Sequence, residues 1–336
     1  MARADELRMI LRVAQLYHLD GLTQSEISER QHISQATISR LLKKAEQIGI
    51  VRKTVVAPRG TFPDLEARLR DHYGIQEAIV TECFADQEDA ILSAVGTAAA
   101  HYLETTLDDG EVIGISSWSA SLLRMVESIH PTKRHAENVV QMLGGIGNPA
   151  VQSHATQLTT RLAELTGAKP LLLPAQGVAS SSAAKLVVLG DSYVRSTMDQ
   201  FRRVTVALVG IGALQPSVML ANSGNTFTHE ELQDLERRGA VGDICVRFFD
   251  RHGRPMDGPL DERVIGISLE ELRSVPRVIG VAGGARKATA IRAALLGGYV
   301  DVLITDRFTA ERLAEDQPLG ERHEALHAED SRHHGR

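Results

Sequence analysis

From about residue 60 onward, short runs of apolar residues alternate with longer amphipathic segments. The runs are EAIVT (77–81), EVIGI (111–115), NVVQML (138–143), PLLL (170–173), VTVALVGIG (204–212), DICVRF (243–248), RVIGVAG (277–283) and DVLIT (301–305). Segments such as AILSAVGTAAAHYLETTL and ATAIRAALLGG separate them and have helical spacing. Near-continuous apolar strands that alternate with helices are typical of a parallel sheet covered on both faces. The pattern therefore predicts an α/β domain with a mainly parallel sheet, whose ligands bind beyond the carboxyl ends of the strands.

Glycines follow three of these runs, in the segments LGGIGN (143–148), VGIGAL (209–214) and VAGGARK (281–287). Glycine permits close backbone approach, and the free N–H groups at the start of a following helix can bind an anion. Lys287 follows the last glycine pair, so its ammonium could reach a phosphate held by that loop. We expect one shared site for an anionic ligand, with contacts from Gly144, Gly145, Gly212, Gly283, Gly284 and Lys287. The alternative is that these glycines only form tight corners between strands and helices.

Polar and aromatic residues at other strand ends could contact the same ligand. The segment ISSWSAS (115–121) contains Trp118, which could stack on a sugar, and Ser119 and Ser121, which could cap a helix or bind phosphate. Asp243 could accept hydrogen bonds from sugar hydroxyls, and Gln176 could donate or accept one. A purely structural tryptophan and a turn role for Asp243 are the alternatives.

The sequence contains no Walker loop, no dinucleotide fingerprint and no HExxH pattern. The two cysteines, Cys83 and Cys245, lack the paired spacing of a zinc site, and we interpret both as buried apolar side chains. We therefore expect no cofactor, no metal ligand and no catalytic residue.

The N-terminal segment, 1–60, has a different pattern, with short helical stretches separated by capping residues. Apolar residues at helical spacing predict a first helix over about residues 5–19, namely Leu7, Ile10, Leu11, Ala14 and Tyr17. Thr23 and Glu26 have the spacing of a capping box, which predicts a second, short helix that ends near Gln31. Ser34 is the N-cap expected for a third helix. Two helices separated by three or four residues form a helix-turn-helix.

The apolar spacing supports this interpretation. Ile27, Ile33, Ile38 and Leu41 are placed so that both helices and the turn can share one small core, while the small Ser28 allows close crossing. His32 stands in the turn where the pattern of bacterial repressors usually has glycine, and histidine tolerates positive φ better than most residues.

The opposite face of the third helix carries residues that suit a major groove. Gln and Arg can pair with base edges, Ala can touch a thymine methyl, and Ser and Lys can hold phosphates. We expect DNA contacts from Gln24, Ser34, Gln35, Ala36, Thr37, Ser39, Arg40 and Lys43. The segment IVRKTVVAP (50–58) reads as a strand pair or wing, with Arg52 and Lys53 on the DNA backbone. The alternative is a solvated basic face without a partner.

The charge distribution separates the two parts of the chain. Residues 1–60 contain ten Lys or Arg and six Asp or Glu, a net charge of +4, although the whole chain has a net charge of −6. A basic module on an acidic body indicates a polyanion partner for this N-terminal segment alone. We expect a small all-α helix-turn-helix domain over 1–57, a larger α/β effector domain over 58–316 and a polar, disordered tail over 317–336. No apolar run is long enough to span a membrane, so we expect a cytoplasmic protein.

Together, LTQSEIS, ISQATISRLLKKA, GGIGNP, VGIGAL, GDICVRFFD and VAGGARKATAIRAALLGGYVDVLITD resemble the SorC family of sugar-responsive bacterial transcriptional regulators over nearly the whole chain. The resemblance implies a helix-turn-helix domain joined to an effector domain similar in fold to ribose-phosphate isomerases and glucosamine-phosphate deaminases. It also implies operator binding as dimers or tetramers, with an affinity that a phosphorylated sugar alters.

The resemblance places phosphate or sugar contacts at Gly144 and Gly145, at Asp243, at Gly283 and Gly284, and at Lys287. This chain departs from many relatives, which have Gly and Thr where it has Ser119 and Ser121, and from some that have Arg where it has Gln176. Loss of an arginine removes a bidentate phosphate contact.

We therefore expect an effector-controlled transcriptional regulator and not an enzyme, with double-stranded operator DNA, a sugar, polyol or sugar phosphate, and further copies of itself as partners. A sugar-phosphate isomerase or deaminase is the alternative. A constitutive architectural DNA-binding protein fits less well, because an α/β domain as large as the one expected over 58–316 exceeds what dimerisation requires.

Overall fold

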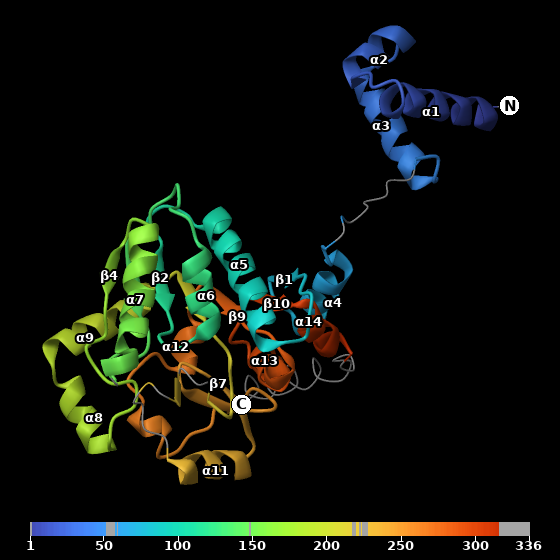
Figure 1. Ribbon diagram of the computed structural model, residues 1–336. Helices are drawn as coiled ribbons and strands as arrows, with labels where there is room; N and C mark the ends of the chain where they lie inside the picture. The colour runs from blue at the N-terminus through green and yellow to red at the C-terminus, as the bar shows by residue number, and fades with distance from the viewer. Residues whose placement is uncertain are drawn as a thin grey trace, which may run out of the picture. The chain divides into compact units, whose positions relative to one another are not determined.

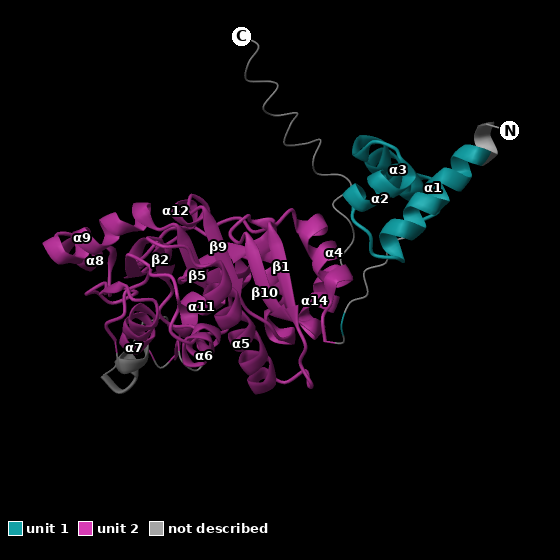
Figure 2. Cartoon of the chain, turned by 90° about the horizontal axis from the view of Figure 1, so that it is seen from above, with its two compact units in different colours: residues 1–58 teal, residues 59–336 magenta. Residues whose placement is uncertain are grey.

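The structure, a computed structural model, describes residues 2–51, 58, 60–147, 149–216, 220–221, 223 and 228–315. The chain forms two compact units, Met1–Pro58 and Arg59–Arg336 (Figure 2). Arg52 and Lys53 of the expected wing, and the expected tail over 317–336, lie outside the described residues. Within the described ranges, no helix has the length and apolar character needed to cross a membrane.

The described part of the first unit contains the helices α1 (Ala2–His18), α2 (Gln24–Gln31) and α3 (Gln35–Gln47) (Figure 1). The predicted capping box is present, because the Thr23 hydroxyl accepts from the Glu26 N–H and the Glu26 carboxylate accepts from the Thr23 N–H. Ser34 caps α3 by accepting from the Thr37 N–H at 3.2 Å. His32 lies between α2 and α3 with φ of 55°, so histidine adopts the left-handed conformation of the turn. The predicted helix-turn-helix is confirmed.

The core of this unit matches the prediction for α2 and α3 but not for α1. Ile27 and Ile38 are fully buried, and Ile33 and Leu41 pack against them. In α1, Leu7 and Leu11 are 44% and 46% exposed, so the predicted stripe is wrong there. The buried residues of α1 are instead Ile10, Val13, Ala14 and Leu16. Helical spacing was compatible with two overlapping faces, and only packing against α2 and α3 decides which one is covered.

The second unit is built on a seven-stranded parallel sheet, as the alternating pattern predicts. The strand order is β1-β10-β9-β5-β2-β3-β4. The strands are β1 (Glu77–Thr81), β2 (Val112–Ile115), β3 (Asn138–Gln141), β4 (Lys169–Leu171), β5 (Val206–Val209), β9 (Arg277–Val281) and β10 (Val302–Asp306). Each lies within or beside one of the apolar runs.

Helices cover both faces of this sheet. One face packs against α5 (Glu88–Thr106), α6 (Ala120–Ser128) and α7 (Pro149–Leu165) (Figure 2). The other packs against α4 (Pro63–Tyr73), α12 (Leu269–Arg273), α13 (Ala288–Leu296) and α14 (Arg307–Ala314). Ile113 and Ile115 belong to the first core and Val112 to the second, so successive residues of β2 bury on opposite faces. This two-sided burial explains the nearly continuous apolar runs.

The remaining helices that the structure describes are α8 (Ser182–Leu189), α9 (Ser192–Met198) and α11 (His229–Arg237), with 3₁₀ turns at Asp199–Arg203, Asp261–Arg263 and Ala285–Lys287. Both cysteines are buried, as predicted.

A small antiparallel sheet contains β6 (Gly212–Ala213), β7 (Ala240–Ile244) and β8 (Arg247–Asp250). The run DICVRF, expected as one strand, is therefore a hairpin whose two-residue turn consists of Cys245 and Val246, with φ of 52° and 62°. Positive φ at both turn positions defines a type I′ turn, which usually requires Asn or Gly. Because Val246 is β-branched, the turn is strained, and the run carried no turn residue that would have predicted it.

Candidate functional site

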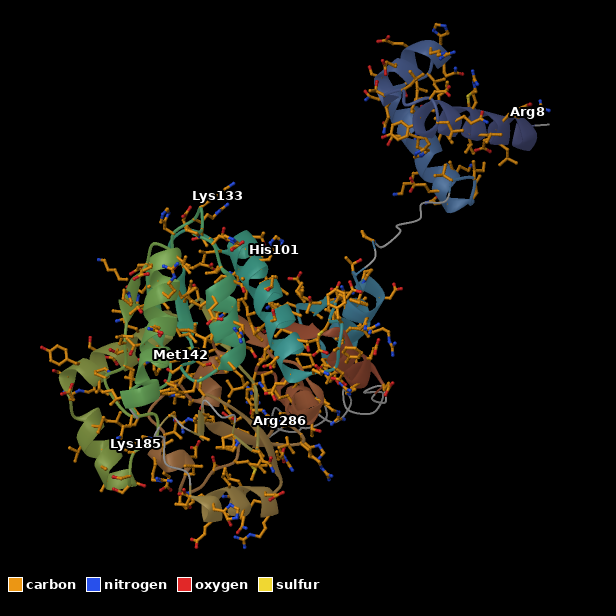
Figure 3. The ribbon with its side chains drawn as sticks, viewed as in Figure 1. Arg8, His101, Lys133, Met142, Lys185 and Arg286 are labelled. Atoms are coloured by element: carbon orange, nitrogen blue, oxygen red, sulfur yellow. The ribbon has the colours of Figure 1, made fainter. Side chains whose placement is uncertain are left out.

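A pocket lies beyond the carboxyl ends of β2, β5 and β9, where ligands of parallel sheets bind. Its walls come from the segments after these strands and from the β7–β8 hairpin, and include Ser116, Trp118, Ser119, Gly210, Gly212, Asp243, Cys245, Val246, Arg286 and Lys287. Arg286 is labelled in Figure 3. The cavity volume is about 60 Å³, so the pocket in this conformation encloses only a small part of a sugar-sized ligand.

A buried carboxyl, Asp243, and a half-buried ammonium, Lys287, give the pocket its electrostatic character. Asp243 is only 6% exposed, and its Oδ2 accepts a hydrogen bond from the Val246 N–H at 3.0 Å. Burial raises the pKa of Asp243 to about 6, although the Val246 N–H and the Lys287 ammonium favour the charged form. Burial also lowers the pKa of Lys287, and the neighbouring Arg286 lowers it further. Among the residues that the structure describes, none accepts a hydrogen bond from the Lys287 ammonium, which is therefore available to an anion.

Glycines bring the backbone against the polar side chains of the pocket. A Cβ atom at Gly212 would lie 2.0 Å from Oδ1 of Asp243, and one at Gly210 would lie 2.2 Å from Oγ of Ser119. Ser119 also caps α6 by accepting from the Leu122 N–H at 3.3 Å. A larger residue at either position would therefore force the facing polar side chain to shift.

Gly283 and Gly284 border a second hollow of about 190 Å³, which shares Glu88, Leu92, Arg286 and Lys287 with the first pocket. Gly284 has φ of 96° and donates its N–H to Oδ2 of Asp306 at 3.0 Å and to Oγ1 of Thr309 at 2.7 Å. Asp306 is fully buried and also accepts from the N–H and the hydroxyl of Thr309. The start of α14 thereby fixes the backbone that presents Lys287.

The outer face of α3 carries the predicted DNA-contacting residues Gln35, Ala36, Ser39, Arg40 and Lys43, all of them exposed. Gln24 and Thr37 are half-buried, and Arg40 donates to the Thr37 hydroxyl at 3.2 Å. Lys44 pairs with Glu6 of α1 and does not belong to this face. The face offers donors, acceptors and a methyl group, which is the combination that reads base edges.

Comparison with known families matches both units. Residues 60–315 match a model described as "Putative sugar-binding domain", and residues 10–55 match the MarR family. The chain is 31% identical to the Sorbitol operon regulator of Klebsiella pneumoniae over 317 residues, which covers 93% of this chain and 99% of that protein. The chain belongs to the SorC family of transcriptional regulators.

Other relatives and solved structures give the same match. The Deoxyribonucleoside regulator of Bacillus subtilis is 32% identical over 315 residues, which covers 93% of this chain and 99% of that protein. The crystal structure of full-length SorC from K. pneumoniae superposes with a TM-score of 0.70 at 30% identity, covering 92% of this chain and 99% of that one. A sugar-binding domain of a regulator from Pseudomonas syringae reaches 43% identity and a TM-score of 0.60, covering 76% of this chain and 100% of that one.

The structure brings many, but not all, of the predicted effector contacts together. Trp118, Ser119, Gly212, Asp243 and Lys287 line the first pocket, and Gly283, Gly284 and Lys287 line the second. Ser121, Gly144, Gly145 and Gln176 line neither of the two hollows.

Packing accounts for the position of most of this outlying group. A Cβ at Gly144 would meet the Gln176 backbone at 2.4 Å, and Gly145 forms a β-bridge with Gln176. Trp118 donates from Nε1 to the Gly144 carbonyl at 3.2 Å, so this bridge also anchors the pocket's aromatic wall. Ser121 is fully buried in α6, and its hydroxyl has no partner in the described part of the chain.

Sequence reasoning missed several residues that border or support the site, among them Ser116, Glu88, Arg286, Asp306 and Thr309. Arg286 directly precedes Lys287 and was predictable from that adjacency. Asp306 and Thr309 have the spacing of an N-cap pair, but nothing in the sequence connects them with a glycine loop that precedes them by a whole helix and strand. No group of three or more His, Cys, Asp or Glu suited to a metal ion occurs among the described residues.

Replacing Thr309 with valine should destabilise the second unit by about 1 to 2 kcal/mol, because it removes a buried hydroxyl that bonds both Gly284 and Asp306. Thr309→Ser keeps the hydroxyl and is the matched control. Thermal or denaturant unfolding of both variants measures the difference, and equal stability of the valine variant and the parent would contradict the assigned contacts.

Proposed function

We propose that the protein is a transcriptional regulator of carbohydrate or polyol metabolism whose operator binding is controlled by a sugar, a polyol or a sugar phosphate. The observation that carries the proposal is the pocket in which the buried Asp243 carboxyl lies with the Lys287 ammonium, for which the described residues offer no hydrogen-bond acceptor, in a chain that also has a helix-turn-helix. The relatives named as regulators of sorbitol and deoxyribonucleoside genes support this class of ligand.

In the proposed DNA complex, residues 1–57 bind the operator and α3 enters the major groove. Gln35 and Arg40 pair with base edges and Ala36 touches a thymine methyl. The remaining predicted contacts, which hold phosphates or position the helix, are Gln24, Ser34, Thr37, Ser39 and Lys43. Because operators for such proteins are two-fold related, we propose that a homo-oligomer binds both half-sites.

In the proposed effector complex, residues 58–316 bind the ligand, which extends across the two hollows. Lys287 binds the anionic end beside the Gly283–Gly284 backbone, while Asp243 and Ser119 face the hydroxyl groups and Trp118 borders the ring. A phosphate beside the Lys287 ammonium gains a charge-assisted hydrogen bond, whereas the Gly284 N–H is already donated to Asp306 and Thr309. Ligand binding then shifts the oligomer between arrangements that match or mismatch the operator.

We also propose that the protein is not an enzyme. A sugar-phosphate isomerase or deaminase needs a positioned base beside an acid partner. In the pocket, the best candidates for such a pair are Asp243 and Lys287; Oδ2 of Asp243 already accepts from the Val246 N–H, and no histidine is among the described residues that line the pocket. The relatives named above are called regulators, which agrees with this proposal.

The deciding experiment measures binding of the purified chain to DNA from its own promoter region at fixed salt. The DNA is titrated with and without a panel of pentoses, hexitols and their phosphates. We expect one compound to change the affinity for this DNA several-fold and not to be consumed. Equal binding to random duplex would contradict operator recognition, and turnover of a panel member would contradict the non-enzymatic role.

Arg40→Ala should weaken specific operator binding by about 1 to 3 kcal/mol, because it removes a paired contact to a base edge. Arg8 is an exposed arginine of α1, so Arg8→Ala makes the same charge change away from α3 (Figure 3). Titration of operator and random duplex with both variants measures the effect. Unchanged specific binding by Arg40→Ala would remove Arg40 from the reading face.

A further inference from the structure

The two hollows of the site adjoin along residues that line both of them, namely Glu88, Leu92, Arg286 and Lys287. The Arg286 guanidinium joins two segments at this boundary. It donates to the Gln215 carbonyl at 3.2 Å and to Oε1 of Glu88, the first residue of α5, at 3.4 Å. The ion pair between Arg286 and Glu88 therefore stands between the two hollows.

Neither hollow can hold a sugar phosphate by itself. Their volumes are about 60 and 190 Å³, whereas small-ligand sites usually have at least about 300 Å³. A ligand of that size must extend across the boundary between the hollows. The Arg286 and Glu88 side chains must then separate or shift, because they line both hollows.

The contact between Arg286 and Glu88 is weak enough to be exchanged. The two side chains are 42% and 67% exposed, and exposed ion pairs contribute little to stability. Their separation of 3.4 Å is also long for a charge-assisted hydrogen bond. A phosphate group offers more negative charge and more acceptor oxygens than one carboxylate does. It can therefore compete with Glu88 for the guanidinium.

The neighbouring Lys287 gives a physical reason for this exchange. Burial lowers the pKa of Lys287 most, the positive charge of Arg286 lowers it further, and Glu88 and Asp243 act in the opposite direction. The two cations are therefore close enough to repel each other, and Glu88 is one of the groups that offset the repulsion. A dianion beside both cations would offset it more strongly than a single carboxylate, whereas a neutral polyol would not.

We propose that Arg286 is a second anion-binding residue of the effector site, which exchanges Glu88 for the phosphate group of the effector and binds that group together with Lys287. The inference rests on the proposed function, because it takes a sugar phosphate as the effector. Arginine suits this role, since its guanidinium can donate to two phosphate oxygens at once. Glu88 is then a competitor that lowers the affinity for phosphate.

Two substitutions with opposite expected effects test the exchange. Arg286→Gln should weaken binding of inorganic phosphate about tenfold, because a charge-assisted hydrogen bond is lost. Glu88→Gln should strengthen it about two- to fivefold, because the competing carboxylate is gone. Equilibrium dialysis of the full chain with radiolabelled inorganic phosphate, at fixed ionic strength and at a pH where phosphate is the dianion, measures both effects.

An exposed ion pair elsewhere in the second unit provides matched controls. Arg161 and Glu164 of α7 lie 3.1 Å apart and are 58% and 66% exposed. Arg161→Gln and Glu164→Gln make the same charge changes away from the site, so both should bind phosphate like the parent. Equal effects at the site and at this control pair would show that only the overall charge matters, and would overturn the proposal.

The double variant separates exchange from general repulsion. If Glu88 acts by occupying Arg286, the gain from Glu88→Gln should be largely lost when Arg286 is already replaced by glutamine. An equal gain in both backgrounds, unchanged binding by Arg286→Gln, or a parent chain that binds no phosphate would contradict the exchange. A gain in affinity at position 88 cannot arise from loss of folding, so this measurement stays decisive even if the Arg286 variant is unstable. Operator DNA is absent from these titrations, so their failure is distinguishable from failure of the proposed function.

Discussion

Replacing Lys287 with methionine should weaken binding of a sugar phosphate about 100-fold and abolish its effect on operator affinity, while DNA binding without effector stays unchanged. The ammonium lies in the part shared by the two hollows and has no partner among the described residues. A charge-assisted hydrogen bond in such an environment contributes up to about 3 kcal/mol, which corresponds to roughly a 100-fold change in affinity. Methionine keeps much of the chain length, so the packing should be retained.

Calorimetric titration with one responsive sugar phosphate and with its unphosphorylated form measures this effect. Lys133→Met removes an exposed charge elsewhere in the second unit and should bind both compounds like the parent. We expect the loss at position 287 to be much larger for the phosphorylated compound. If Lys287→Met binds the sugar phosphate as tightly as the parent does, the phosphate is held elsewhere and the orientation of the ligand in the pocket must be reversed.

Much of the fold could be predicted from the sequence because the burial pattern of each element is local. Strands buried on both faces give continuous apolar runs, and the caps Thr23 and Ser34 mark helix starts within three residues of the groups they bond. The DICVRF run shows the limit of this reasoning. Its turn consists of Cys245 and Val246 at positive φ, which neither residue type favours, so only the surrounding packing selects a hairpin there.

The candidate site was predictable where its residues follow a strand directly, and less so where contacts arise from chain segments far apart. Lys287 follows this rule, because it lies in the segment after β9. Asp243 does not, because it belongs to the small antiparallel sheet, in which it pairs with Gly212. The glycines of LGGIGN look like those of VAGGARK in sequence. In the fold, however, Gly144 and Gly145 are explained by close packing against Gln176 and Gln141. Similar glycine motifs therefore lie in different packing environments, which the sequence of each motif alone does not reveal.

Replacing Asp243 with asparagine should stabilise the second unit at pH 8 by about 3 kcal/mol, because the parent must hold a carboxylate in a buried site whose pKa is raised to about 6. Asparagine has the same shape and retains an oxygen that can accept from the Val246 N–H. This gain in stability is expected even though the substitution removes the favourable interaction between the Lys287 ammonium and the carboxylate. Such a site is destabilising for the fold, which agrees with a role in binding a ligand.

The sign of the pH dependence follows from the direction of the shift. Between pH 4 and pH 6 the unfolded chain releases the Asp243 proton while the folded chain retains it, so the parent loses stability as the pH rises through this window. Above pH 6 both states are ionised and the loss is complete. The asparagine variant has no such proton, so its advantage over the parent should grow by about 1 to 2 kcal/mol between pH 5 and pH 8. Denaturant unfolding of both proteins at these two values measures it. A difference that does not change with pH would show that Asp243 is ionised throughout, which would mean that Lys287 and the hairpin N–H outweigh the effect of burial.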